Sequence, residues 1–318
     1  QTAPESVRIA AARTAALLDI NQAGPALFDL LKDTKLSPDL RVESLKALAA
    51  LKDSRLAEAV AIAAGDPNEL LRTEALPWQA QFKPADALSQ VAAVLEKGSV
   101  IEKQAALNTV ASLDNPVAET ILLGWLDNLM AGQIPKELQL DLIEAAAKRP
   151  APAIKDKLSQ FESRRAKSDA LSAYRETLFG GHAQAGKKIF FERADVACLR
   201  CHKINGEGGE VGPELKGIGT SKTREYLLES ILFPNKDIAV GYETVVVKTK
   251  NGNSYAGRVK NETERELLVI SPEDGLVVLA KSQLQSRERS LSAMLPELGT
   301  ILSKRDLRDL VEFLASLK

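Results

Sequence analysis

The chain has 318 residues, which is long enough for two or three domains with a buried core each. Hydrophobic residues make up 45% of it, and 42 lysines and arginines stand against 43 aspartates and glutamates, so the formal net charge is −1. This balance argues against nucleic acid as a partner. Charged residues also interrupt every apolar run before the roughly 18 residues that a membrane span needs. The composition therefore indicates a globular protein without a membrane span.

Residues 1–178 have the pattern of a helical domain. Alanine and leucine dominate, and apolar positions recur at helical spacing. Proline suits the first turn of a helix and ends the helix before it, so the prolines predict helix boundaries. They stand at Pro25, Pro38, Pro67, Pro84, Pro116, Pro135 and Pro150. We expect short helices of roughly 10–16 residues between these points, and no strand.

A short motif repeats within this region. A basic residue followed four positions later by leucine occurs in Arg41–Leu45, Arg72–Leu76 and Lys103–Leu107, at a spacing of 31 residues, and a fourth copy centres on Leu142. The motif resembles that of HEAT-like repeats, although the period is shorter than the usual ~40 residues. Stacked helix pairs of this kind form an α-solenoid. The alternative is an irregular helical bundle.

The composition changes twice after residue 180. Glycine is frequent from Gly181 to about residue 239, which is typical of a loop wrapped closely around a ligand. Residues 241–289 are rich in β-branched side chains, with a hairpin signal at Asn251-Gly252, and predict a small antiparallel meander. Its expected strands are Tyr242–Lys248, Ser254–Lys260, Glu266–Ser271 and Leu276–Ala280. After Pro296 the helical pattern returns, with Ser303 as a good N-cap.

Cysteine, histidine and methionine are scarce, with two of each in the chain. A transition-metal site must therefore draw on carboxylates or on Cys198, Cys201, His182, His202, Met130 and Met294. Three of these residues form the motif C-x-x-C-H at Cys198–His202. This is the attachment motif of c-type haem, in which two thiols bond to the vinyl groups and the adjacent histidine ligates the iron. We predict one haem c, bound through Cys198 and Cys201 with His202 as an axial ligand.

Three other interpretations of the cysteine pair are available. A thioredoxin-like site would lie within a βαβ pattern, whereas here a glycine-rich loop follows the motif. A structural zinc site needs four ligands, and only the distant His182 could complete it. The third interpretation is a disulfide between Cys198 and Cys201 in a chain with no other cysteine. The haem interpretation is favoured over all three.

The flanks of the motif resemble class I cytochromes c. Residues 181–190 are similar to the "G-D-x-x-x-G-x-x-x-F" opening helix of that family, with His182 in the place of a helix-capping aspartate. Gly212-Pro213-Glu214-Leu215 is similar to the family's G-P-x-L turn. The resemblance implies that the Pro213 carbonyl accepts a hydrogen bond from the ring N–H of His202 and so orients the imidazole.

The same resemblance implies the second axial ligand. Met294 stands in a loop just before the final helix, where class I cytochromes place their distal methionine. Met130 lies on an expected solenoid helix beside Trp125 and is more simply a packing residue. His182, expected as an exposed N-cap, is the remaining candidate, and an open or water-ligated iron is the other alternative.

Residues 181–317 as a whole resemble the haem-binding domain of planctomycete and verrucomicrobial proteins. The segments that carry this resemblance are Cys198–His202, Val211–Leu215, Tyr226–Asn235, Gly241–Thr244 and Asp309–Leu314. In that family HEAT-like segments often precede the cytochrome, and a sugar or alcohol dehydrogenase domain often precedes both. The resemblance implies a redox partner protein or a fused dehydrogenase domain as electron donor.

The expected fold is mainly α: a HEAT-like α-solenoid at 1–178, followed by a class I cytochrome c-like domain at 179–318 with a small antiparallel β insertion at about 241–289. The expected function is single-electron transfer, and the alternative is a haem enzyme or a gas or redox sensor with an open sixth position. Because haem c is attached outside the cytoplasm, we expect a periplasmic location or one on the outer face of the cytoplasmic membrane. The repeat pattern starts abruptly at Ser6-Val7-Arg8, so we also expect the chain to be the C-terminal part of a larger, exported protein.

Overall fold

The computed structural model describes residues 3–318, apart from the side chain of Ala85, and divides into two compact units. The first unit ends at Arg165 and the second is Ala166–Lys318. Segment 166–178, assigned by its sequence to the helical repeats, contributes Leu171 and Leu178 to the core of the second unit. Among the described residues, no helix is both long and apolar enough to cross a membrane.

The described part of the first unit consists of short helices joined by turns. They are α1 (Glu5–Leu17), α2 (Gly24–Lys32), α3 (Pro38–Ala50), α4 (Leu56–Ala64), α5 (Glu69–Phe82), α6 (Pro84–Lys97), α7 (Val100–Ser112), α8 (Pro116–Met130), α9 (Lys136–Ala147) and α10 (Pro152–Ser163). Prolines open α3, α6, α8 and α10, as their missing N–H and fixed φ favour. Side-chain caps satisfy free N–H groups at several helix starts: Ser37 caps α3, Asn68 caps α5 and Ser99 caps α7.

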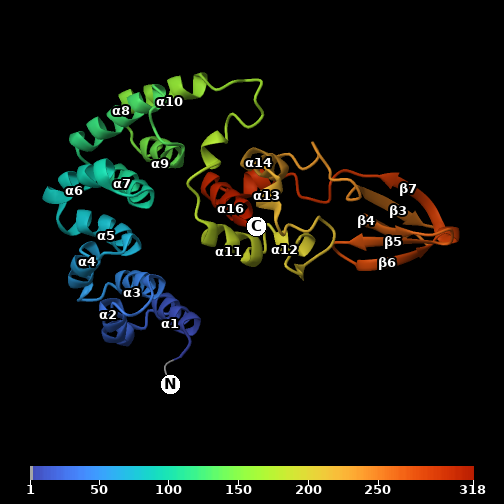
Figure 1. Cartoon of the computed structure of the whole chain (residues 1–318), viewed down its shortest axis with the longest axis horizontal. Coiled ribbons are helices and arrows are strands. Elements are labelled where there is room, and N and C mark those ends of the chain that lie inside the picture. Colours follow the sequence, from blue (N-terminus) through green and yellow to red (C-terminus); the bar gives the residue numbers. More distant parts are fainter. Residues whose placement is uncertain (1–2) are drawn as a thin grey trace. The chain divides into compact units, whose positions relative to one another are not determined.

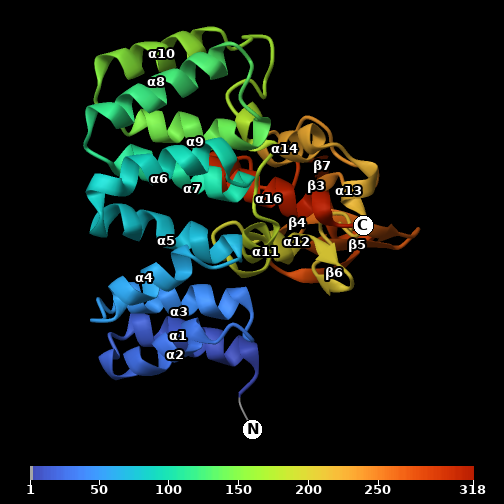
Figure 2. The same cartoon turned by 60° about the vertical axis from the view of Figure 1, so that its left-hand side comes forward.

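These helices form two layers, which are visible in both views (Figures 1 and 2). The odd-numbered helices from α1 to α9 contact one another in sequence, and the even-numbered helices lie against them on one side. Two leucine- and alanine-rich cores fill the space between the layers, the first around Leu45 and the second around Leu122. The repeated motif of the sequence falls on α3, α5 and α7, all within the same layer.

The basic residue of that motif has a structural role. Arg41 is buried; its Nε donates to the carbonyl of Leu31 at 2.8 Å, and its Nη2 pairs with Asp66 at 2.6 Å. One repeat later, Arg72 donates from Nη1 to the carbonyls of Asp66 and Pro67, at 2.9 and 2.7 Å. In these two copies of the motif, the cation therefore binds carbonyl groups that helix ends and turns leave unpaired.

The second unit combines helices with a small sheet. Its helices are α11 (Ala183–Glu192), α12 (Cys198–Cys201), α13 (Ile218–Ser221), α14 (Arg224–Leu232), α15 (Leu298–Ile301) and α16 (Lys304–Ser316). Helix α11 packs across α16 with almost no space between them, because a Cβ on Gly186 would lie 1.9 Å from the carbonyl oxygen of Asp309. Leucines and phenylalanines of α11, α14 and α16 form the core around this crossing.

The predicted antiparallel sheet is confirmed, with one strand more than expected. Its strands are β3 (Thr244–Thr249), β4 (Ser254–Glu262), β5 (Glu266–Ser271), β6 (Gly275–Ala280) and β7 (Leu284–Arg289), in the order β6-β5-β4-β3-β7. Strand β7, which the sequence pattern did not predict, returns to pair with β3. One face of the sheet carries its own small apolar core around Val247, Leu267 and Val269. The sheet projects from the helices of its own unit (Figure 1).

Candidate haem-binding site

The two cysteines lie on α12, a single helical turn. The backbone enters this turn through Ala197, whose φ of 46° is left-handed, and the turn closes with the His202 N–H donating to the carbonyl of Cys198 at 2.9 Å. Both cysteines are half-buried and neither forms a disulfide. Burial raises the pKa of the Cys198 thiol to about 11 and also raises the pKa of Cys201. Neutral thiols of this kind are unlike the thiolate of a thioredoxin-type site, which needs a lowered pKa.

The ring of His202 is held from two sides. Its Nδ1 lies 3.0 Å from the carbonyl oxygen of Pro213, so the tautomer with a proton on Nδ1 donates to that oxygen and leaves Nε2 free to bind a metal. Gly212 lies against the ring, and a Cβ there would be 2.6 Å from Cε1. Burial lowers the pKa of His202 against the opposing effect of the Pro213 carbonyl, which favours the neutral imidazole that ligates metals.

The glycine-rich loop after the motif wraps back onto α12. Strands β1 (Lys203–Ile204) and β2 (Glu207–Gly208) form a short hairpin. Beyond it, the N–H of Gly209 donates to the carbonyl of Leu199 at 2.9 Å, and the N–H of Gly212 donates to that of Cys201 at 2.8 Å. A Cβ on Gly209 would lie 1.9 Å from the carbonyl oxygen of Arg200, so this close approach requires glycine.

Met294 lies in the loop between β7 and α15. It is half-buried and packs against the apolar core to which Cys198 and Leu215 also contribute. Its N–H donates to Ser292 Oγ at 3.2 Å, and the N–H of Ser292 donates to Asn235 Oδ1 at 2.8 Å, so the loop is held close to the end of α14. The structure thus brings Met294 and the C-x-x-C-H segment to one core.

The two competing ligands lie elsewhere. Met130 ends α8 in the first unit. His182 is the exposed N-cap residue of α11; its backbone N–H donates to Asp309 Oδ1 at 2.8 Å, and its side chain makes no capping hydrogen bond. Within residues 3–318, no cluster of three or more cysteine, histidine or carboxylate side chains could hold a metal ion, which removes the support for a zinc site.

The residues present therefore fit a haem c better than the alternatives. Both thiols are half-buried and neutral, the imidazole of His202 has a fixed ring and a free Nε2, and the thioether of Met294 packs against the same apolar core as Cys198. A thioether and an imidazole are suitable donors for haem iron, and an apolar shell controls the access of water to it.

The sheet is connected to this site by two contacts that sequence reasoning did not predict. Arg200, between the two cysteines, donates from Nε to the carbonyl of Pro272 in the β5–β6 turn at 2.8 Å. Glu210, in the glycine-rich loop, pairs with Lys203 at 2.6 Å and with Lys260 of β4 at 2.9 Å. These hydrogen bonds lower the pKa of Glu210 to about 2. The insertion is therefore attached to the haem-motif loop by a hydrogen bond and by an ion pair.

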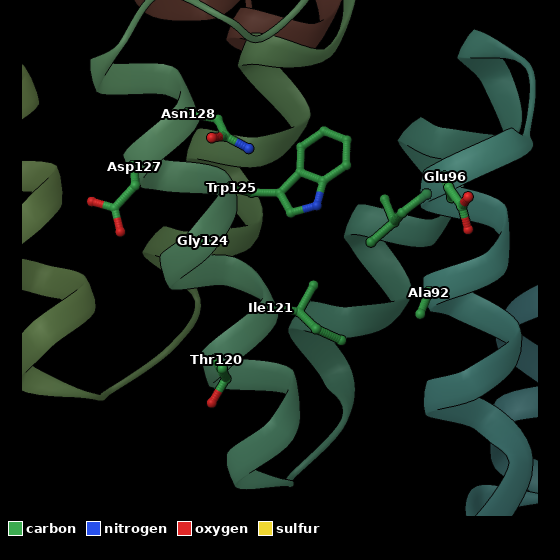
Figure 3. Close-up of a pocket in the computed structure, with 9 residues that line it drawn as sticks. Ala92, Glu96, Thr120, Ile121, Gly124, Trp125, Asp127 and Asn128 are labelled. Carbon is green, nitrogen blue, oxygen red and sulfur yellow. The ribbon is translucent and has the colours of Figure 1, made fainter.

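The first unit has a hollow of its own between α6 and α8 (Figure 3). It is an open groove of about 560 Å³, and the residues that line it include Leu95, Glu96 and Asp127. The side chains of Trp125 and Ile121 project into it from α8. None of the predicted haem residues lines it.

The comparison with known proteins agrees with the geometry of the second unit. Residues 183–269 match the family model of cytochrome c, a range that includes α11, the C-x-x-C-H segment, the G-P-x-L turn, β3, β4 and part of β5. No curated protein gives a significant match to the chain. The family match supports a cytochrome c-like, haem-binding domain in the second unit of this chain.

Proposed function

We propose that the protein is a c-type cytochrome that transfers single electrons through one haem c. Cys198 and Cys201 would hold the haem covalently, and His202 and Met294 would be the axial ligands. The electron donor would be a dehydrogenase, either a partner protein or a fused domain, and the protein would act in the periplasm or on the outer face of the cytoplasmic membrane. The first unit would be a HEAT-like solenoid that serves as scaffold and docking surface, as in the planctomycete and verrucomicrobial proteins that the sequence resembles.

The observation that carries this proposal is the setting of His202. His202 directly follows the second cysteine in the sequence, and its Nδ1 lies at hydrogen-bond distance from the carbonyl oxygen of Pro213. The C-x-x-C-H segment also lies within the range that matches cytochrome c. A neutral imidazole with a fixed orientation is what an axial iron ligand requires.

Haem iron supplies a one-electron couple, and ligation by histidine and methionine raises its potential. The chain's own residues would hold the axial ligands in place and limit the access of water to the iron. Gly212 and Pro213 fix the imidazole from two directions, and the apolar core around Met294 limits the access of water. A fixed ligand set favours electron transfer over the binding of exogenous ligands.

The first test asks whether haem is attached. Acid–acetone extraction should leave the colour with the polypeptide of the wild type, and a variant with Cys198→Ala and Cys201→Ala should lose the attached colour. Colour that extracts freely from the wild type, or one zinc per chain in its place, would contradict the proposal.

The second test concerns Met294 and separates electron transfer from an open-site enzyme or sensor. Met294→Ala should let carbon monoxide bind quickly to the ferrous haem, whereas the wild type should bind it slowly. Met130→Ala is the matched control because it removes the other methionine, and it should behave as the wild type. If the wild type binds carbon monoxide as fast as Met294→Ala does, the open-site function replaces electron transfer.

A further inference from the structure

The outer edge of β6 is an unprotected sheet edge. Strand β6 lies at one edge of the five-stranded sheet, and no described strand pairs with its outer side. The opposite edge strand, β7, carries Arg287, Glu288 and Arg289, charges of the kind that block unwanted pairing. Strand β6 reads Gly-Leu-Val-Val-Leu-Ala and has no charged residue, and the side chains of Leu276 and Val278 are each 55% exposed.

The hydrogen-bond pattern shows which backbone groups of β6 face outward. The N–H of Lys281 donates to the carbonyl of Arg265 at 2.8 Å, so this pair is a hydrogen-bonded pair of the β5–β6 ladder. Hydrogen-bonded and non-hydrogen-bonded pairs alternate in an antiparallel ladder. The N–H and C=O groups of Leu276, Val278 and Ala280 therefore point to the open edge.

The same three residues direct their side chains to one face of the sheet. The neighbours of Leu276 and Val278 on this face are Ile270 and Leu268 of β5, directly opposite in the register. An apolar corner of the sheet thus lies next to a row of unpaired backbone donors and acceptors. A second strand at this edge would form hydrogen bonds with the backbone groups and pack against the apolar corner.

We propose that β6 is a dimerisation edge, where two copies of this chain pair antiparallel around a two-fold axis at Val278. Val278 then lies opposite itself, and Leu276 lies opposite Ala280 of the second copy. Each of these outward pairs exchanges both of its backbone hydrogen bonds. The two five-stranded sheets become one continuous sheet, and the contact is closed because each copy uses the same edge.

Charge favours a second copy as the occupant. No charged residue lies within the paired strands, so self-pairing sets no like charges against each other there. At the strand ends, the same register places Lys281, which pairs with Glu262 of its own chain at 2.7 Å, opposite Gly275 and beside the acidic turn residues Glu273 and Asp274 of the second copy, once at each end. Charges of opposite sign at these two points are complementary and favour this register around Val278.

The test uses the full haem-loaded chain in a dilution series followed by sedimentation. The wild type should show a dimer whose fraction falls on dilution. Val278→Lys places two ammonium groups beside the two-fold axis and should sediment as a monomer at every concentration. Gln285→Lys adds the same charge to an exposed position on the opposite edge strand, β7, and should dimerise as the wild type does.

Residue-resolved hydrogen exchange on the wild type needs no variant. The amides of Leu276, Val278 and Ala280 should gain protection as the concentration rises, whereas those of Val277 and Leu279, already bonded to β5, should be protected throughout. A wild type that stays monomeric with the three outward amides unprotected would overturn the proposal. Protection that appears only when another protein is added would also overturn it, and would assign the edge to that protein's strand.

Discussion

Replacing Gly212 by alanine tests the geometry of the candidate site directly. The added Cβ would lie 2.6 Å from Cε1, 2.8 Å from Nδ1 and 3.0 Å from Nε2 of His202. Ordinary contacts begin at 3.4 Å, so the ring or the loop must move by about 0.8 Å. A displacement of that size strains the 3.0 Å hydrogen bond between Nδ1 and Pro213.

Gly212→Ala is expected to lower the free energy of unfolding in two ways. Overpacking of a tight contact typically destabilises by about 1–3 kcal/mol, and a lost hydrogen bond adds about 0.5–1.5 kcal/mol. Together these give about 2–4 kcal/mol, which for a unit of this size corresponds to a fall in melting temperature of roughly 5–15 °C. A weaker bond to Pro213 also makes the imidazole less basic, so the reduction potential should rise.

Thermal unfolding and redox titration of the haem-loaded protein measure both effects. Gly124→Ala is the control, because a Cβ at that helical position meets nothing within 4 Å. It should leave the potential unchanged and slightly raise the stability of its helix. A Gly212→Ala protein with the melting temperature and potential of the wild type would refute the packing of His202 described above.

Two further predictions concern the supports of the site. The pKa of Glu210 is lowered from 4.5 to about 2, so its ion pairs stabilise the fold above pH 4.5, and this contribution is lost as the pH falls from there towards 2. Glu210→Gln should therefore lower the melting temperature at neutral pH, and near pH 2 its melting temperature should equal that of the wild type. Glu207→Gln on the same loop should have the melting temperature of the wild type at both pH values. Gly186→Ala should force α11 away from the Asp309 carbonyl and destabilise by about 1–3 kcal/mol or more in denaturant unfolding, and a stability equal to the wild type would disprove the tight crossing.

Local features of the chain were predictable because they depend on neighbouring residues. Proline at the first turn set the starts of α3, α6 and α8, and the β-branched runs and the hairpin at Asn251-Gly252 predicted β3 and β4. The expected strands Glu266–Ser271 and Leu276–Ala280 coincide with β5 and β6 to within a residue. In each case propensity and turn chemistry agree with the final packing.

Other features depend on contacts that are distant in the sequence. Strand β7 reads Leu-Gln-Ser-Arg-Glu-Arg, without a β-branched residue, and is extended because it pairs with β3. The bond from Arg200 to Pro272 joins residues 72 positions apart, and nothing in either local pattern indicates it. Segment 166–178 has a helix-like composition, yet it packs with the second unit because Leu171 and Leu178 find their apolar neighbours there.

The sheet insertion explains how Met294 can stand 92 residues after His202 in the sequence and still pack against the same core as Cys198. The two ends of the insertion are bonded to each other: the Ser290 N–H donates to the carbonyl of Thr244 at 2.8 Å, and the Ser292 N–H donates to Asn235 Oδ1 at 2.8 Å. The cost of closing a loop grows only slowly with its length, and a folded sheet between joined ends costs less than a flexible loop of the same length. The insertion therefore acts as a short connection, which brings the chain back to the helical core at Met294.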